Sequence, residues 1–259
     1  MFACGAYLTA LFSMKLGLNP LLSVLISAIL TGLISFLIGY PLLKLLRQDY
    51  FALATLALAQ ASFVLLRSFA PGGNAGISGI PSLNTHLYSL SAPSIDVLII
   101  LLCITAFCLL VIFRISRTRF GRLVDASRID ENMTSILGFS PLKIRSQVFL
   151  LAGIFAGGAG ALQAHYIGAV DPTLSSIQMT ILILCGTILS GNKSFWGCSV
   201  GTVFIILLPE VLQRLLTFLF GSNWIIFQWV QVLYGLIIVI LVFTVFPVKK
   251  SFLKSDVGG

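Results

Sequence analysis

The sequence predicts an all-α fold, a polytopic transmembrane helical bundle with about seven to eight membrane segments. Hydrophobic residues make up 58% of the 259 residues and charged residues 9%, whereas a soluble domain carries about 25% charged residues. Residues 21–40 contain no charge and are long enough to cross a bilayer as a helix. One long polar segment, residues 114–145, lies between two apolar stretches. We therefore expect a chain that crosses a membrane repeatedly and holds this segment at its surface.

The boundaries of the expected elements follow from the apolar stretches and from the turn-forming residues between them. Membrane-crossing helices are expected at residues 21–40, 50–66, 97–113, 141–166 and 224–246. Shorter apolar helices are expected at residues 2–14, 177–189 and 199–216, the last with a kink at Pro209. Between them we expect turns at 15–20 and 167–175, a connection at 41–49, an irregular loop at 70–94 and an interruption at 190–197.

The distribution of Lys and Arg predicts the orientation of the bundle. When successive connections alternate between two sides, thirteen of the sixteen Lys and Arg fall on the side of residues 114–145. Basic residues gather on the cytoplasmic side of membrane proteins, so this segment is predicted to be cytoplasmic and the 70–94 loop external. The formal net charge of +8 then reflects topology. Nucleic acid is not an expected partner, because the basic residues form no continuous patch elsewhere.

The polar segment 114–145 has a predicted helix of its own. Ser127 and Asp130 resemble a capping box, which places Asp130 and Glu131 in a first helical turn, where the helix dipole favours anions. Gly138 is expected to end this helix and Pro141 to begin the next. An apolar helix face outside the membrane binds a partner protein, or lies on its own bundle or on lipid. The residues predicted to form this face are Ile129, Met133, Ile136 and Leu137.

Three features inside the apolar segments have functional as well as structural interpretations. Small residues at helical spacing favour close helix packing, and this is the interpretation we prefer for Gly153, Gly157, Gly158 and Gly160. The interruption at 190–197 is either a broken helix that lines a cavity or an ordinary surface turn. Ionisable residues in membrane segments are often functional, but Glu210 and Arg214 are four residues apart and are expected to pair with each other.

Few catalytic or metal-binding patterns occur in the chain. There is no G-x-x-x-x-G-K-[ST] phosphate-binding loop and no H-E-x-x-H zinc motif. His86 and His165 are far apart in sequence, and a lone histidine is more often a satisfied surface or interface residue than a ligand. The five cysteines have no metal-type spacing and are expected to be reduced, small apolar residues. We expect no cofactor, no metal site and no catalytic residue.

Several segments resemble a known family. They include RQDYFALATLALAQ followed by GGNAGISGIPSL, the long stretch from SRTRFGRLVDASRIDENM to HYIGAVDP, then ILSGNKSFWGCSVGTVFIILLPEVLQ and LYGLIIVILVFTVFP. These segments resemble branched-chain amino acid ABC permeases, and the closest type is the LivM-like subunit of the LivHM permeases. The resemblance implies a single transmembrane permease domain over residues 1–259, in which 114–145 is a cytoplasmic coupling loop. Family members have further helices before the stretch matched by Gly5, Ala6 and Tyr7, so the resemblance implies a shortened subunit, a fragment or a misassigned start.

The resemblance also implies partners and site residues. It implies a multi-pass subunit of the bacterial inner membrane, with a LivH-like second permease, two cytoplasmic ATPase subunits and an external solute-binding protein. The expected solutes are branched-chain amino acids or related small polar solutes. The family's coupling helix is matched at Asp130, Glu131, Leu137 and Gly138, and with the apolar face the expected ATPase-coupling residues are Ile129, Asp130, Glu131, Met133, Ile136, Leu137 and Gly138. The candidates for the translocation pathway or broken helix are Gln60, Ser190, Gly191, Asn192 and Gly197.

Two alternatives to an ATP-driven permease subunit remain. An ion-coupled secondary transporter needs titratable residues near the middle of the membrane, and only Glu210 and Arg214 come close. A non-transporting membrane scaffold needs neither titratable residues nor ATPase partners. Co-purification of ATPase subunits separates both alternatives from the permease.

Overall fold

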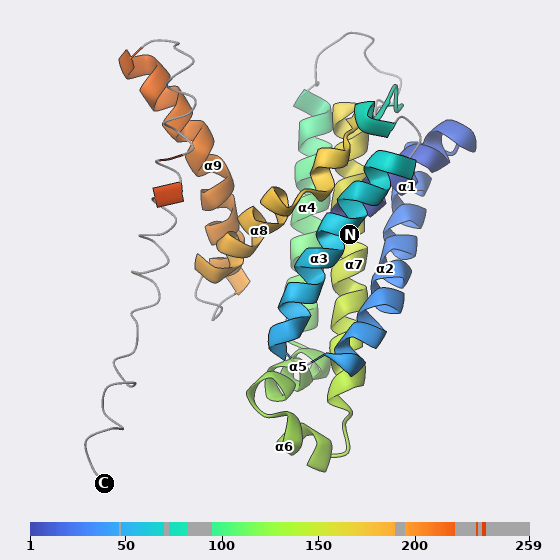
Figure 1. Ribbon diagram of the computed structural model, residues 1–259, viewed down its shortest axis with the longest axis vertical. Coiled ribbons are helices and arrows are strands. Elements are labelled where there is room, and N and C mark those ends of the chain that lie inside the picture. The colour runs from blue at the N-terminus through green and yellow to red at the C-terminus, as the bar shows by residue number, and fades with distance from the viewer. Residues whose placement is uncertain are drawn as a thin grey trace. The chain divides into compact units, whose positions relative to one another are not determined.

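The computed structural model describes residues 1–46, 48–69, 73–81, 95–189 and 195–220, together with positions 232, 235 and 236. The chain divides into two compact units, Met1–Ile177 and Gln178–Gly259, which we describe separately. Almost all described residues are helical (Figure 1), which confirms the all-α prediction. The described helices long and apolar enough to cross a membrane are Pro20–Leu45, Tyr50–Ser68, Ile99–Ser116, Pro141–Ile167 and Gly197–Thr217. Of the helix expected at 224–246, the structure describes only positions 232, 235 and 236, so the predicted number of segments stays a prediction.

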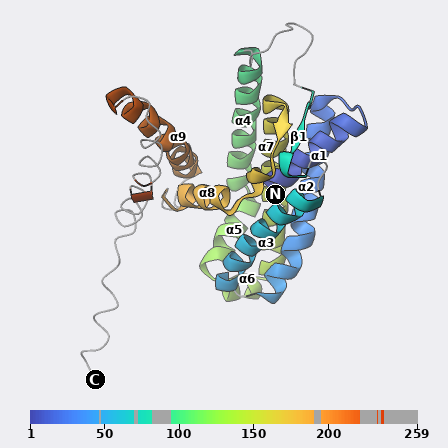
Figure 2. The same cartoon turned by 45° about the horizontal axis from the view of Figure 1, so that its top comes forward.

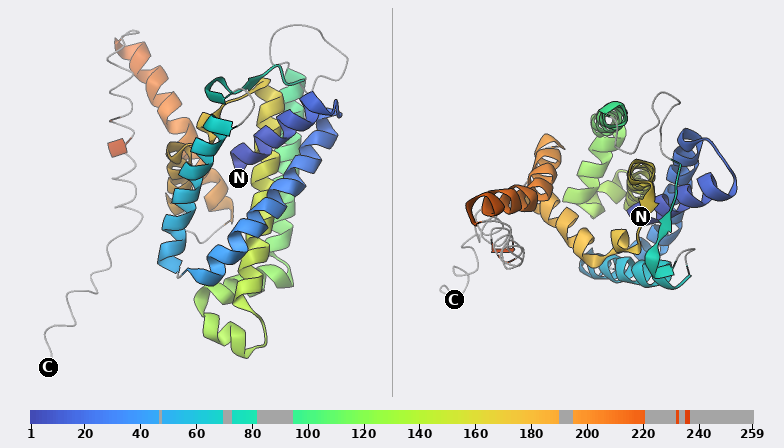
Figure 3. Two further views of the ribbon diagram at one scale, coloured as in Figure 1. Left: turned by 45° about the vertical axis from the view of Figure 1, so that its right-hand side comes forward. Right: turned by 90° about the horizontal axis from the view of Figure 1, so that it is seen from above.

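The centre of the first unit is a bundle of three helices, α1 (Phe2–Lys15), α2 (Pro20–Leu45) and α7 (Pro141–Ile167). The long helices α2 and α7 lie side by side along most of their length, and α1 packs against both (Figures 1 and 3). Helix α2 continues through Pro41 to Leu45, where the sequence predicted a connection. A proline removes a single hydrogen bond within the helix, here near its end, so the helix continues for another turn.

Small residues form the contact between α2 and α7. Ser23, Ser27, Thr31 and Ser35 recur every four residues on α2, and all four are fully or almost fully buried. Opposite them, a Cβ atom built on Gly157 would lie 2.5 Å from the Thr31 Cβ atom. The helices are therefore too close for any side chain at Gly157, which confirms the packing interpretation of this glycine. In lipid, apolar burial does not drive helix association, and close packing of this kind is one of the interactions that replace it.

Two further helices of the first unit match predicted membrane segments. Helix α3 is Gln48–Phe69 and helix α4 is Ile95–Ser116. Each extends by two or three residues beyond both ends of the stretch predicted from the apolar residues. Ser62 on α3 forms a hydrogen bond of 2.6 Å with Ser175, which follows α7 in the chain.

At one end of the first unit, two short strands pair. They are β1 (Ile77–Ser78) and β2 (Ala169–Val170), antiparallel with Ile77 opposite Val170. The 3-10 turns Gly73–Ala75 (η1) and Pro172–Ser175 (η2) flank them. Gly76 has φ of 73°, and a Cβ atom there would collide with the Val170 carbonyl oxygen. The prediction of an entirely irregular loop at 70–94 was therefore wrong for residues 77–78, while residues 70–72 and 82–94 lie outside the described residues.

At the other end, helices α5 (Arg119–Ile129) and α6 (Glu131–Ile136) lie beside the start of α7 (Figure 2). The connections 41–49 and 114–145 thus come together at this end, and the β1–β2 pair lies at the opposite one. This arrangement agrees with alternating connections; which end faces the cytoplasm stays a prediction.

In the second unit, helix α9 is Phe195–Phe220, and helix α8, Ile177–Leu189, has the predicted bounds. Gly186 on α8 lies close to α9, because a Cβ atom there would lie 3.0 Å from the Thr202 Cα atom. Helix α9 begins four residues before the predicted Ser199 and runs through Pro209. Gly197 was assigned to the interruption, but it is part of this helix.

Candidate functional site

The predicted helix of the polar segment is in fact two helices, broken at Asp130. Asp130 has extended backbone angles (φ −151°, ψ 115°) and ends α5. Its carboxylate Oδ1 accepts a hydrogen bond of 2.8 Å from the Asn132 backbone N–H, so it caps the start of α6. The prediction that Ser127 is the cap was wrong, because Ser127 lies inside α5, buried, with its hydroxyl donating to the Val124 carbonyl. Glu131 does lie in the first turn of α6, as predicted.

The end of α6 and the start of α7 confirm two predictions. Gly138 has φ of 83°, a left-handed conformation that glycine adopts without strain. The backbone N–H of Phe139 donates to the Thr134 carbonyl across this turn, at 3.2 Å, as in a glycine-terminated helix end. Ser140 and Pro141 are the N-cap and first residue of α7.

Most apolar side chains predicted to form one helix face are exposed. The exposed fractions are 87% for Ile129, 80% for Ile136, 71% for Leu137 and 47% for the neighbouring Phe139. Ile129 ends α5, so it is not on the same helix as Ile136. The side chain of Met133 lies outside the described residues. We call Ile129, Ile136, Leu137 and Phe139 the exposed loop side chains. Large exposed apolar patches mark interaction sites, and these four side chains are candidates for such a surface.

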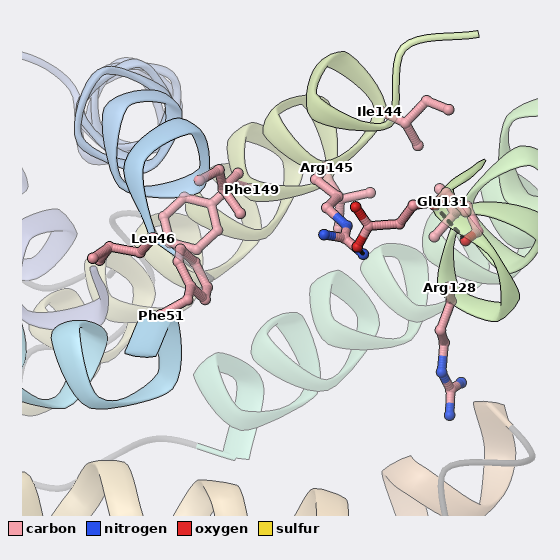
Figure 4. A pocket seen from close by; sticks show the side chains of 11 residues that line it. Leu46, Phe51, Arg128, Glu131, Ile144, Arg145 and Phe149 are labelled. Atoms are coloured by element: carbon pink, nitrogen blue, oxygen red, sulfur yellow. Dashed lines mark hydrogen bonds and ion pairs between the residues drawn. The ribbon is translucent and has the colours of Figure 1, made fainter. Parts of the chain in front are cut away.

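An ion pair attaches α6 to α7. The Arg145 Nη2 atom on α7 lies 2.6 Å from the Glu131 Oε1 atom on α6. The pair lines a cavity of about 660 Å³ between the end of α2, the start of α3, α5, α6 and α7 (Figure 4). The sequence predicted the acidic residue at this position but not its partner or the cavity. The lining residues are Leu43, Leu46, Phe51, Val124, Ser127, Arg128, Glu131, Ile144, Arg145, Val148 and Phe149.

A buried polar cluster around His165 was not predicted. His165 is fully buried near the end of α7, and its Nδ1 atom lies 2.8 Å from the Pro81 carbonyl oxygen. A carbonyl only accepts, so Nδ1 donates. The Nε2 atom lies 3.0 Å from both the Thr9 and the Ser23 hydroxyls, and Ser13 donates to Ser23 at 2.9 Å. The cluster joins α1, α2 and α7 to the strand segment 73–81. The spacing of Thr9 and Ser13, one helical turn apart, was the available sequence signal.

The structure describes two of the candidates for the translocation pathway, Gln60 and Gly197, and they belong to different compact units. Gln60 is exposed on α3, and Gly197 is half-buried in the first turn of α9. Ser190, Gly191 and Asn192 lie outside the described residues. Residues 197–201 read GCSVG and match the G-x-S-x-G pattern of a nucleophile elbow, which requires a strand-to-helix turn. Here they lie within a continuous helix.

Glu210 and Arg214 on α9 form the predicted pair, with 3.0 Å between Arg214 Nη2 and Glu210 Oε1. Both side chains are exposed, and such a pair contributes little to stability. Within the described residues, no group of His, Cys, Asp or Glu is arranged to hold a metal ion.

Comparison with known proteins identifies the family. A family model described as branched-chain amino acid transport system / permease component matches residues 1–242. The chain belongs to this permease family. It is therefore a multi-pass membrane protein of the LivM type, as the resemblance implied. A comparison with solved structures found no match.

Individual relatives agree with the family assignment. The chain is 29% identical over 236 residues to the high-affinity branched-chain amino acid transport system permease protein LivM of Salmonella typhimurium, and 28% identical to LivM of Escherichia coli. In each case the match covers 82% of this chain and 55% of the relative. It is also 24% identical over 228 residues to the fructose import permease protein FruF of Bifidobacterium longum, covering 83% of this chain and 61% of FruF. The chain thus spans about half the length of the LivM relatives it matches.

Proposed function

We propose that the chain is a membrane-spanning permease subunit of an ATP-binding-cassette importer. It would act in a bacterial inner membrane with a LivH-like second permease, two cytoplasmic ATPase subunits and an external solute-binding protein. The observation that carries the proposal is the family match over residues 1–242. The chain itself would hydrolyse no ATP. It would contribute helices to a pathway that opens alternately to either side as the ATPases close and part.

The expected cargo is branched-chain amino acids or related small polar solutes. The LivM relatives are named for branched-chain amino acid transport, which favours this class. FruF is named for fructose import, so the shared sequence pattern does not by itself select the solute.

The proposed contact with the ATPases is α6 with the exposed loop side chains. Helix α6 is fixed on both sides, at its start by the Asp130 cap and the Glu131–Arg145 ion pair and at its end by the turn at Gly138. Between these points it presents Ile136 and Leu137 to solvent. A rigidly held apolar surface of this kind favours binding to a groove on a partner, because little conformational entropy is lost on docking.

The test is the double substitution Ile136→Asp with Leu137→Asp. Burying one such side chain at a contact is worth roughly 1.5–3 kcal/mol, and two buried carboxylates add a desolvation penalty. Both side chains are exposed in the structure, so membrane abundance should remain unchanged. ATPase co-purification and solute uptake should fall together. The matched control is Asn132→Asp with Ser135→Asp, which adds the same charge to exposed positions of α6 without removing apolar surface.

Each alternative gives a different result. Uptake that continues in the double variant with the ATPases bound would refute α6 as the contact. Uptake abolished by dissipating the ion gradient, at unchanged ATP, would support an ion-coupled secondary transporter. Wild-type chain that recruits no ATPase and transports no solute would support a membrane scaffold.

A further inference from the structure

The cavity beside the Glu131–Arg145 ion pair has two chemically different ends. Figure 4 shows Leu46, Phe51 and Phe149 at one end and the ion pair with Ile144 at the other, where the Arg128 side chain extends away from the ion pair. The Phe51 and Phe149 rings meet edge to face, with 5.8 Å between their centroids. A molecule that fills this cavity must be apolar at one end and polar at the other.

The cavity lies where membrane helices end. Its walls come from the last turns of α2, the first turns of α3 and α7, and the two loop helices α5 and α6. The ends of membrane-spanning helices lie at the boundary between hydrocarbon and water. With the orientation assumed in the proposed function, this boundary is the cytoplasmic one. The apolar end is built by α2, α3 and α7, and the charged end mostly by the loop.

The charges at the polar end favour an anion. Two arginines, Arg128 and Arg145, and one acid, Glu131, line the cavity. The surrounding segment 114–145 contains seven Lys and Arg but three Asp and Glu. A guanidinium has five N–H donors in a planar fork, and the structure gives the Arg145 guanidinium one ionic partner among the described residues. Arg145 therefore has donors for a second anion while it keeps Glu131.

We propose that this cavity binds an anionic phospholipid of the cytoplasmic leaflet. The phosphate would bind Arg145 and Arg128, and the first part of an acyl chain would lie against Leu46, Phe51 and Phe149. Basic pockets between membrane helices on the cytoplasmic side are suited to the head groups of anionic lipids. A cavity of about 660 Å³ holds a head group and the upper part of one chain, and the rest of the lipid remains in the bilayer. The bound phosphate would stabilise the contact between α6 and α7.

The experiment measures lipid binding to the purified full chain in detergent micelles by native mass spectrometry. Phosphatidylglycerol and phosphatidylcholine with identical acyl chains are titrated separately. Phosphatidylglycerol should bind more tightly, and Arg145→Gln and Arg128→Gln should each weaken it roughly five-fold, the value of one basic contact near an anionic surface. Arg122→Gln is the matched control, because Arg122 is exposed on the same helix as Arg128 but does not line the cavity. It should leave binding unchanged.

A second variant distinguishes loss of phosphate binding from loss of the contact between α6 and α7. Glu131→Gln breaks the same ion pair as Arg145→Gln, but it removes a negative charge instead of a positive one. Phosphatidylglycerol should bind it at least as tightly as the wild-type chain. If Glu131→Gln lowers the affinity for phosphatidylglycerol as much as Arg145→Gln does, the proposal is overturned. That result would show that the ion pair matters only because it holds α6 against α7. If Arg145→Gln does not yield folded chain, Arg128→Gln and Glu131→Gln carry the comparison.

Two further outcomes would overturn the proposal. Equal affinity for the two lipids would show that no anion site is present. Displacement of the lipid by deacylated glycerophosphoglycerol at the same concentration would show that the occupant is a soluble anion and that the apolar end contributes nothing. The measurement needs neither ATPase nor solute, so failure of uptake counts against the proposed function alone.

Discussion

The close approach of α2 and α7 at Gly157 can be tested against a neighbouring glycine. In Gly157→Ala the new Cβ atom would lie 2.5 Å from the Cβ atom and 2.7 Å from the Oγ1 atom of Thr31. Thr31 is fully buried, and its Cβ atom is fixed to the backbone, so the two helices must move apart by roughly 1 Å to restore normal contact. In Gly158→Ala the nearest atom is the Ala28 Cβ at 3.5 Å, which is ordinary contact.

The pair of variants isolates the packing energy. Replacing glycine by alanine inside a helix favours folding by about 0.8–1 kcal/mol, and this gain is common to both positions. The difference between them is therefore the overpacking cost, about 1–3 kcal/mol. Reversible unfolding of the purified chain in mixed micelles, monitored by helical circular dichroism, measures it. We expect Gly158→Ala to be at least as stable as the wild-type chain. Gly157→Ala should be less stable than Gly158→Ala by the overpacking cost. Equal stability of the two variants would show that α2 and α7 are not in backbone contact here.

Three other predictions concern the two ends of the first unit. Gly138→Ala places a Cβ atom on a residue with left-handed backbone angles, which should cost about 1–2 kcal/mol. We expect weaker co-purification of the ATPases. Gly138→Asn should weaken co-purification less, and an equal effect of the two variants would contradict the backbone explanation. In a cysteine-free chain in intact cells, Ser78→Cys should react with an impermeant thiol reagent and Ser140→Cys should not; the reverse pattern would invert the topology. His165→Ala removes the ring that donates to the Pro81 carbonyl and contacts the Thr9 and Ser23 hydroxyls, and it should cost about 1–3 kcal/mol. Ser13→Ala removes a bond to Ser23 and a longer contact to the ring, while Ser23 keeps its other partners, and it should cost less in the same unfolding assay.

The membrane helices could be predicted because their signal is local. An uncharged stretch of twenty residues requires a helix in lipid, since every backbone polar group must be satisfied within the segment. The turn at Gly138 and the start of α7 at Ser140 and Pro141 could also be predicted from local signals. Glycine permits the left-handed conformation of the turn, and proline fixes φ for the first helical residue. The prediction for residues 127–137 was wrong because two residues compete there as helix caps. Ser127 and Asp130 both fit a helix start, and burial of Ser127 within α5 decides the choice.

Other features could not be read from the sequence because their parts are far apart in it. The strands β1 and β2 have two residues each, too few to show an alternating pattern, and they pair across about ninety residues of chain. His165 meets Thr9 and Ser23 only after α1, α2 and α7 have packed. The serine and threonine stripe on α2 is the exception, since its period of four is visible in the sequence and predicts a buried helix face.

Helix α7 connects the two ends of the first unit. Its 27 residues span about 40 Å. At its start Arg145 binds Glu131 of α6, and at its end His165 binds the Pro81 carbonyl while the Gly168 carbonyl accepts from two N–H groups of the strand segment. Between these points, glycines bring its backbone against α1 and α2 so closely that a small slide would cause collisions. We therefore expect α1, α2 and α7 to move as one rigid body, together with α6 and the strand segment. A displacement of α6 should then displace the opposite end of the first unit as well.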